Sequence, residues 1–268
     1  MDINGRIVAV TGGGSGIGAA LCARFAREGA RGVAVIDRDG EKARAVAQSI
    51  GGLGLACDVT VEPNLIARID EIEARLGPID LFCSNAGLLA NDPDPDDPAS
   101  APDALWTLSL GVHLMSHVYA ARALAPRMAG RGGGYFLNTV SAAGLLTQIG
   151  SGPYSASKHA AVGFAESLAI AYRDRNVRVS ILCPQGVATP MVAGAMETPA
   201  VRDGIIQPGD VADVVMEGLG DERFLILPHP QVLGYMQRKS ADYDRWLRGM
   251  MKLRGPSAGA PGPKPAGR

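Results

Sequence analysis

The chain has 268 residues, of which 47% are hydrophobic, and it carries a formal net charge of −1 at pH 7. This length and apolar fraction suit one sizeable core, and the balanced charge excludes recruitment of nucleic acid or an anionic membrane by a strong overall field. The sequence shows neither a basic leader before an apolar stretch nor an apolar run long enough to span a bilayer, so we expect a cytoplasmic protein with small-molecule partners.

The first predicted elements are a strand, a glycine-rich loop and a helix. The apolar run 6–11 leads into Gly12-Gly-Gly-Ser-Gly-Ile-Gly18, and residues 19–28 have a helix-forming composition. Glycine lets a backbone approach a pyrophosphate closely, and the start of the next helix offers unpaired N–H groups and a positive dipole end. A flexible turn is the alternative for a glycine motif alone, but this order of elements favours a dinucleotide site. Its expected contacts are Gly12, Ser15, Gly16, Ile17 and Gly18.

The second predicted strand, residues 32–37, ends in an acid, Asp37. A carboxylate at this point can accept both hydroxyls of an adenosine ribose and repels a 2′-phosphate, which favours NAD over NADP. Arg38 follows directly, and it could stack on adenine or meet a phosphate. NADP therefore stays open as the second possibility.

Further strand-like runs follow, with helical patterns between them, at residues 53–58, 79–84, 135–140, 177–183 and 223–227. Near-continuous apolar strands that alternate with helices predict parallel β-α-β units. The expected fold is therefore α/β, with a doubly wound, Rossmann-like and predominantly parallel seven-stranded sheet and helices on both faces. Such sheets bind ligands beyond the carboxyl ends of their strands, where we expect Gly12, Asp37, Asp58, Asn85, Ser141 and residues 184–189 to meet.

We expect a single domain over residues 1–254 and a disordered tail over 255–268, which is rich in Gly, Pro and Ala. Alternating prolines splay the aspartates of segment 88–102 apart, so an exposed loop near the pocket rim is favoured over a metal site. The cysteines lack the close pairing of metal ligands and are predicted to be reduced core residues. These residues are Asp92, Asp94, Asp96 and Asp97, and Cys22, Cys57, Cys83 and Cys183.

The run Tyr154-Ser-Ala-Ser-Lys158 places a phenol and an ammonium four residues apart, on one face of a helix. A lysine beside a tyrosine favours the phenolate, so the pair can exchange protons nearer neutral pH than a free tyrosine. Taken alone, such a pair is commonly structural. Its weight comes from the other motifs of the chain.

Together these motifs resemble the short-chain dehydrogenase/reductase family over about residues 2–227. The resemblance implies an NAD-dependent oxidoreductase that transfers hydride between a nicotinamide and the carbon of a secondary alcohol or ketone. The shared marks are Thr11-Gly-Gly-Gly-Ser-Gly-Ile-Gly18, Asp58, Asn85-Ala-Gly87, Ser141, Tyr154-Ser-Ala-Ser-Lys158 and Pro184-Gln-Gly-Val-Ala-Thr-Pro190.

The resemblance also implies roles for single residues. Tyr154 is the expected acid–base residue, Lys158 lowers its pKa and binds the nicotinamide ribose, and Ser141 orients the substrate oxygen. The remaining cofactor contacts are expected at the adenine (Asp58, Val59), along the cofactor path (Asn85, Gly87) and at the carboxamide (Val187, Thr189).

Two positions depart from the family pattern. His113 stands where the family usually has an asparagine that anchors a proton-relay water, and a neutral imidazole could hold the same water or simply be packed. His117 lies one turn further on, but a metal pair lacks an evident third ligand. Gln185 replaces a glycine and could reach the substrate or point to solvent.

The family places a substrate flap after Thr189, here at about 190–207, in which Met191 and Met196 suggest an adaptable apolar lid. A helical segment at about 230–254 contains Tyr235, Met236, Trp246, Met250 and Met251. If this segment folds over the pocket, the substrate is hydrophobic and fairly bulky; core or subunit contacts are the alternative. The family is usually dimeric or tetrameric, so we expect a homo-oligomer, and specifically a homotetramer.

Two other functions deserve comparison with the dehydrogenase. One is a non-catalytic dinucleotide-sensing protein on the same fold, and the other is an epimerase or dehydratase of related longer chains. A sensor is expected to lose the catalytic pair, whereas Ser141, Tyr154 and Lys158 are all present. The short chain and the spaced glycines favour the dehydrogenase over the epimerase.

Overall fold

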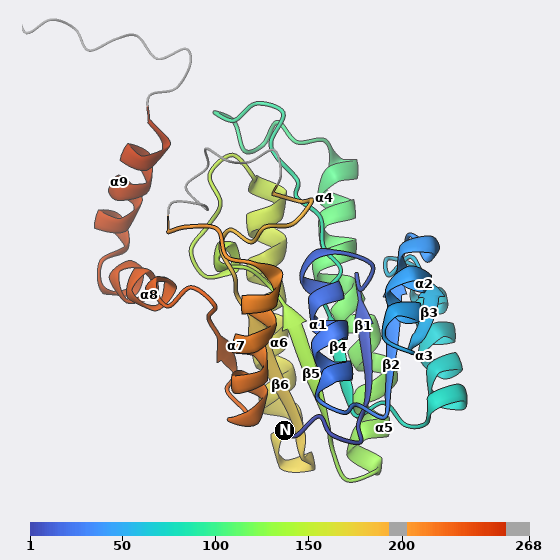
Figure 1. Ribbon diagram of the computed structural model, residues 1–268. Helices are drawn as coiled ribbons and strands as arrows, with labels where there is room; N and C mark the ends of the chain where they lie inside the picture. The colour runs from blue at the N-terminus through green and yellow to red at the C-terminus, as the bar shows by residue number, and fades with distance from the viewer. Residues whose placement is uncertain (193–202, 256–268) are drawn as a thin grey trace, which may run out of the picture.

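The computed structural model describes residues 1–192 and 203–255, and within them seven strands form one parallel sheet (Figure 1). The strand order is β3-β2-β1-β4-β5-β6-β7, so the chain changes direction across the sheet between β3 and β4. The predicted doubly wound α/β fold is confirmed. The strands are β1 (Ile7–Thr11), β2 (Gly32–Asp37), β3 (Leu53–Ala56), β4 (Leu81–Ser84), β5 (Gly134–Thr139), β6 (Val177–Leu182) and β7 (Leu225–Ile226).

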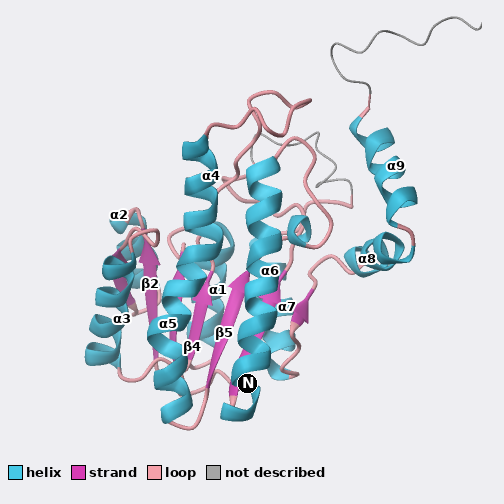
Figure 2. Cartoon of the chain, turned by 180° about the vertical axis from the view of Figure 1, so that it is seen from behind, coloured by secondary structure: helices cyan, strands magenta, loops and turns pink. Residues whose placement is uncertain are grey.

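Helices cover both faces of the sheet, as the two opposite views show (Figures 1 and 2). All five residues of β1 are buried, because successive side chains enter two different cores: Ile7 and Ala9 one, Val8 and Val10 the other. The first core is covered by α3 (Glu62–Leu76), α5 (Ser116–Gly130) and α6 (Gly152–Tyr172), and the second by α1 (Gly16–Arg27), α2 (Gly40–Ser49) and α7 (Pro208–Gly220).

The long helix expected from Asp103 onward is interrupted. Helix α4 (Asp103–Leu110) passes into a π-helical turn, Gly111–Met115, before α5 begins at Ser116. The hydroxyl of Ser116 donates to the carbonyl of Val112 at 2.6 Å. A π-turn widens the helix by one residue per turn and is frequent at functional sites. Here its central residue is His113.

The acidic segment 88–102 is mostly exposed, as predicted, but Asp92 is buried. Both of its carboxylate oxygens accept from the amide of Gly152, at 2.9 and 3.0 Å. Next to it, the hydroxyl of Ser151 donates to Oδ1 of Asn91 at 2.9 Å. A carboxylate at a helix N-terminus satisfies a free amide and the dipole. The loop therefore fixes the start of α6, the helix that carries Tyr154 and Lys158.

The C-terminal segment forms two helices, α8 (Gln231–Ala241) and α9 (Tyr243–Arg254), beside the layered body (Figure 1). They are separated by the extended residue Asp242, whose side chain caps α9 by accepting from the amide of Arg245 at 2.8 Å. Among the described helices, none combines the length and apolar character needed to cross a membrane. The predicted tail beyond residue 255 and the flap residues 193–202 lie outside the described residues.

Candidate active site

A cavity of about 820 Å³ runs along the carboxyl edge of the sheet and takes in most of the predicted site residues. Gly18 and His113 are not part of its lining, and Met196 lies outside the described residues. The predicted residues that line it are Gly12, Ser15, Gly16, Ile17, Asp37, Arg38, Asp58, Val59, Asn85, Gly87, Ser141, Tyr154, Lys158, Gln185, Val187, Thr189 and Met191.

The glycine loop has the close packing that its sequence suggested. Gly12 and Gly16 have φ angles of +62° and +51°, in the region that favours glycine. A Cβ atom at Gly18 would lie 2.1 Å from the carbonyl oxygen of Gly12, so Gly18 packs α1 against the loop and does not face the cavity. The first turn of α1 therefore opens onto the cavity with its amides and positive dipole end, which suits a pyrophosphate.

At one end of the cavity, Asp37 is held in place by backbone amides. Its two oxygens accept from Gly14 and Asp39, each at 3.0 Å. Nearby, Asp58 accepts from the amide and hydroxyl of Thr60, at 2.9 and 2.7 Å, and these bonds lower the pKa of Asp58. The carboxylates at this end are therefore fixed in position with oxygens that can accept the hydroxyls of an adenosine.

Asn85 joins three strand ends and does not extend its side chain into the cavity as a free group. Its Nδ2 donates to the carbonyls of Thr11 and Gly12, at 3.1 and 3.3 Å, and its Oδ1 accepts from the hydroxyl of Thr139 at 3.0 Å. Both protons of Nδ2 and one lone pair of Oδ1 are thus used by protein groups. Asn85 shapes the cavity floor between the glycine loop and β5.

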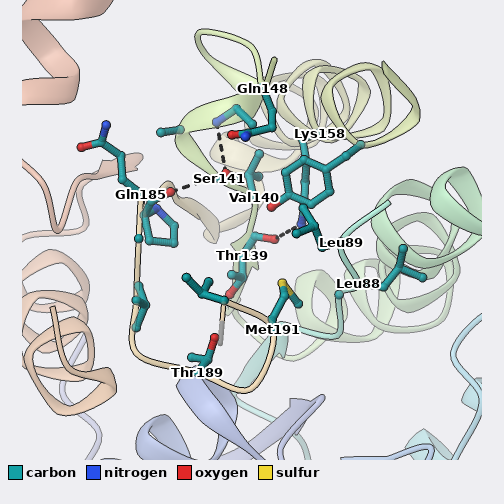
Figure 3. A pocket seen from close by; sticks show the side chains of 18 of the residues that line it. Leu88, Leu89, Thr139, Val140, Ser141, Gln148, Lys158, Gln185, Thr189 and Met191 are labelled. Atoms are coloured by element: carbon teal, nitrogen blue, oxygen red, sulfur yellow. Dashed lines mark hydrogen bonds between the residues drawn. The ribbon is translucent and has the colours of Figure 1, made fainter. Parts of the chain in front are cut away.

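Three of the four predicted catalytic side chains, Ser141, Tyr154 and Lys158, meet at the other end of the cavity, where Figure 3 shows Ser141 and Lys158 with their partners. Burial raises the pKa of Tyr154, and a hydrogen bond with Ser141 partly opposes this. Nζ of Lys158 lies 5.7 Å from the centre of the Tyr154 ring and donates to the carbonyl of Thr139 at 3.0 Å. The expectation that Lys158 brings the pKa of Tyr154 below its free value is not met in this structure, because burial dominates.

Lys158 is itself strongly affected by its surroundings. It is 3% exposed, and burial lowers its pKa to about 7. Within the described residues its ammonium has a single hydrogen-bond acceptor, the carbonyl of Thr139, although it carries three protons. A proton on Lys158 is therefore held weakly at neutral pH.

His113 lies behind the cavity wall and bridges two segments. Its Nε2 accepts from the amide of Leu88 at 3.1 Å, so Nδ1 bears the proton and donates to the hydroxyl of Ser157 at 2.9 Å. Burial, and then the charge of Lys158, lower the pKa of His113 to about 2. Both nitrogens are occupied, so the predicted role of holding a relay water finds no free atom. The structure places His113 as a packed, neutral bridge.

His117 differs from His113 in its hydrogen bonding. Neither of its nitrogens has a partner within the described residues, although the side chain is 1% exposed. Burial and the charge of Lys158 lower its pKa to about 3, so it is neutral. In the part of the chain that the structure describes, there is no group of three or more His, Cys, Asp or Glu side chains placed to hold a metal ion. All four cysteines are free and buried.

Gln185 lines the cavity, but its side chain points away from Ser141 and Lys158 (Figure 3). The backbone amide of Gln185 donates to Nδ1 of His229 at 3.2 Å. The side-chain oxygen is buried and has no hydrogen-bond partner in the described residues. Gln185, a predicted substrate contact, thus lies at the cavity wall with its side chain turned away from Ser141 and Lys158.

The outer wall contains residues of the C-terminal helical segment for which the sequence left pocket, core and subunit contacts open. Tyr235, Trp246 and Met250 line the cavity, whereas Met251 is 66% exposed. The C-terminal helices therefore do cover the pocket. Further lining residues that the sequence did not single out are Asn91, Leu108, Val112, Leu146, Gln148, Ile149, Asp203, Arg238 and Leu253. In the sequence, the helical spacing of aromatic residues and methionines pointed to pocket contacts only in the segment that forms α8 and α9.

A parallel doubly wound sheet, a glycine-loop cradle and a hydroxyl–phenol–ammonium group in one cavity define a dinucleotide-binding α/β oxidoreductase. Comparison with known proteins agrees. The family model for short chain dehydrogenase matches residues 6–200. The protein belongs to the short-chain dehydrogenase/reductase family, and it is an NAD(P)-dependent oxidoreductase.

Similar proteins include 1-deoxy-11-beta-hydroxypentalenate dehydrogenase of Streptomyces exfoliatus, 38% identical over 84% of each chain. A short-chain dehydrogenase/reductase from Burkholderia phymatum, solved in complex with NAD, superposes with a TM-score of 0.81 at 27% identity, covering 91% of this chain and 96% of the other. A 7 alpha-hydroxysteroid dehydrogenase, complexed with NADH and 7-oxo glycochenodeoxycholic acid, gives a TM-score of 0.74 at 26% identity, with 84% and 93% covered.

Proposed function

We propose that the protein is an NAD-dependent dehydrogenase that interconverts a secondary alcohol and a ketone on a hydrophobic, fairly bulky substrate. The observation that carries this proposal is the convergence of Ser141, Tyr154 and Lys158 in the cavity that also contains the glycine loop. A hydride carrier bound along the loop and an alcohol beside Tyr154 would share one enclosed space. A homo-oligomer, dimer or tetramer, is proposed by family analogy only.

The dinucleotide, when bound, supplies the position that accepts or donates hydride at the substrate carbon. In the oxidising direction Tyr154, as the phenolate, takes the hydroxyl proton of the alcohol and becomes the phenol; in the reducing direction the phenol gives this proton to the substrate oxygen. The hydroxyl of Ser141, fixed by the amide of Ala143 at 3.1 Å, orients the substrate oxygen and shares its developing charge. Lys158, when protonated, stabilises the phenolate from the adjacent helix turn.

The preference for NAD is supported by Asp37, which lines the cavity at its adenosine end with both oxygens fixed. A fixed carboxylate accepts ribose hydroxyls and repels a 2′-phosphate. Arg38 lines the same end, and it is the residue that would let NADP bind once the carboxylate is removed.

The proposal of a bulky apolar substrate is supported by the apolar part of the cavity lining. Three segments of the chain contribute to it: Val112, Leu146 and Ile149, and Trp246 and Met250. The names of two similar proteins point in the same direction, since one acts on a hydroxypentalenate and the other on a hydroxysteroid. An apolar cavity of this kind binds substrates more tightly when they bury a large hydrocarbon surface.

The test is nicotinamide absorbance with purified protein, NAD or NADP, and secondary alcohols and ketones from small aliphatic to bulky alicyclic. The Tyr154→Phe variant should bind NAD like the wild type yet lose turnover by on the order of 10²–10⁴-fold. Tyr172→Phe, which makes the same change near the end of α6, is the matched control and should keep full activity. Undiminished turnover in Tyr154→Phe contradicts the mechanism; tight NAD binding without turnover on any substrate favours a dinucleotide-sensing protein.

A further inference from the structure

Lys239, on α8, is 8% exposed although it carries a charge. Its Nζ donates to the carbonyl oxygens of Leu145 and Leu146, at 2.9 and 2.8 Å, in the loop that leads from Ser141 to α6. It also lies 3.4 Å from Nε2 of His159 on α6. A buried ammonium is costly unless its three protons find acceptors, and these three atoms provide them.

The hydrogen bonding of His159 fits this arrangement. Its Nδ1 lies 2.9 Å from the carbonyl oxygen of Ser155, which can only accept, so Nδ1 bears the proton. Nε2 is then left as an acceptor that faces Lys239. Ser155 also ties the same loop to α6, because its hydroxyl donates to the carbonyl of Gln148 at 3.1 Å and accepts from its amide at 2.8 Å. The loop is therefore held from α6 and from α8.

The ammonium also contacts the first turn of α9. Nζ lies 5.4 Å from the ring centre of Tyr243 and 4.8 Å from that of Trp246, within the range of a cation–π interaction. None of the twelve residues of α9, all of them described, is buried. This helix is therefore held by few contacts, among them Lys239 at its start and the 3.8 Å ion pair of Arg254 with Asp96 at its end.

We propose that Lys239 is a positioning residue that sets the size of the substrate pocket. One ammonium holds the 145–149 loop on one side of the cavity and, through Trp246, the α9 wall on the other. The proposal rests on the proposed function in assigning the enclosed space to a bulky hydrophobic alcohol. A small alcohol that occupies only the space beside Ser141 and Tyr154 has no need of that wall.

The first test compares Lys239→Met with wild type on a small aliphatic and a bulky alicyclic alcohol. Methionine keeps the stem and removes the charge, so KM for the bulky alcohol should rise about tenfold, while kcat/KM for the small alcohol stays within about twofold. Lys239→Arg keeps a cation with donors and should restore part of the loss. Lys252→Met, the same change on the exposed surface of α9, is the control. Equal losses on both alcohols, or none on either, overturn the proposal.

A second readout does not depend on turnover. The chain has two tryptophans, Trp106 and Trp246, so a Trp106→Phe background reports on Trp246 alone. Adding Lys239→Met should shift the emission of Trp246 to the red and increase its quenching by acrylamide, because the ring is released to solvent. If no alcohol is turned over but Trp246 responds, the proposed function fails while the positioning role stands. An unchanged Trp246 signal overturns the positioning role even in an active enzyme.

Discussion

The ring of His113 stands edge-on to the ring of Tyr154, with centroids 5.3 Å apart and planes at 88°. The two residues are also joined through Ser157, whose hydroxyl accepts a hydrogen bond from Nδ1 of His113 and donates one to the Tyr154 carbonyl at 3.0 Å. On its other side, His113 holds the amide of Leu88. The neutral imidazole of His113 therefore packs against the Tyr154 ring and links it to the loop after β4 and, through Ser157, to the backbone of α6.

Removing the His113 side chain should lower both the free energy of unfolding and the turnover. His113→Leu leaves the half-buried Leu88 amide without its acceptor, which costs about 1–3 kcal/mol of unfolding free energy. His113→Gln can still accept from that amide and should lose less. Thermal unfolding and kcat/KM of the two variants check this. Equal losses in both variants contradict a role for the hydrogen bond.

The state of His113 also predicts the pH dependence of the enzyme. With a pKa of about 2, the imidazole is neutral at every pH at which the fold is expected to work. The raised pKa of Tyr154 means that the phenolate needed for oxidation becomes more abundant as the pH rises. Lys158, whose pKa is about 7, loses the charge that stabilises this phenolate over the same range, so the two titrations oppose each other. The kcat/KM profile for alcohol oxidation should therefore show no histidine limb near pH 6.5. A limb there that His113→Gln removes contradicts this.

Asp37→Ala should relax the preference for NAD. Loss of two charge-assisted hydrogen bonds to the ribose, and of the repulsion of a 2′-phosphate, should lower the NAD/NADP ratio of kcat/KM by roughly tenfold or more. Asp39→Ala is the control, because Asp39 caps α2 in the same turn and does not line the cavity. It should reduce stability without changing the ratio. An unchanged ratio in Asp37→Ala places discrimination elsewhere.

Lys158→Met should stabilise the protein while it abolishes activity. The folded state lowers the pKa of Lys158 from 10.5 to about 7, so below pH 7 the lysine is protonated in both states and the full cost, on the order of a few kcal/mol, is present. Between pH 7 and 10.5 only the unfolded chain keeps the proton, so this cost fades as the pH rises. Thermal unfolding from pH 6.5 to 9.5 should show the variant's advantage shrinking; an advantage that grows with pH has the wrong sign.

Asp92→Ala should weaken the start of α6. The amide of Gly152 loses both of its acceptors, which costs about 1–2 kcal/mol, and the position of Tyr154, the third residue of the helix, becomes less fixed. The melting temperature and kcat should therefore both fall. Asp97→Ala, in the exposed part of the same loop, serves as the control and should change neither.

The parts of the site that the sequence predicted well are those set by local rules. Glycines with positive φ, an acid at a strand end and a Tyr–Lys pair at helical spacing are recognisable without knowing what packs against them. The burial of Asp92 was missed, because a proline-rich acidic segment reads as exposed and its partner, Gly152, is 60 residues away. The partners of His113 and the π-turn depend in the same way on which segments dock against α4 and α5.

The raised pKa of Tyr154 was missed for a related reason. Spacing shows that Lys158 shares a helix face with the phenol, but it does not show that both side chains are buried together or that the ammonium faces the Thr139 carbonyl. Lys239 gave no signal at all, since a lysine on an amphipathic helix is expected at the surface. Its burial follows from the fold of the loop after Ser141.

The family model ends at residue 200, whereas the two helices that form the outer wall, α8 and α9, come after it. The residues proposed for chemistry and dinucleotide binding all precede residue 190. The residues proposed for proton transfer and the outer wall of the substrate pocket therefore come from separate stretches of the chain. For engineering, this makes α8 and α9, residues 231–254, the segment to exchange when substrate size is to be changed, and Lys239 the residue to keep.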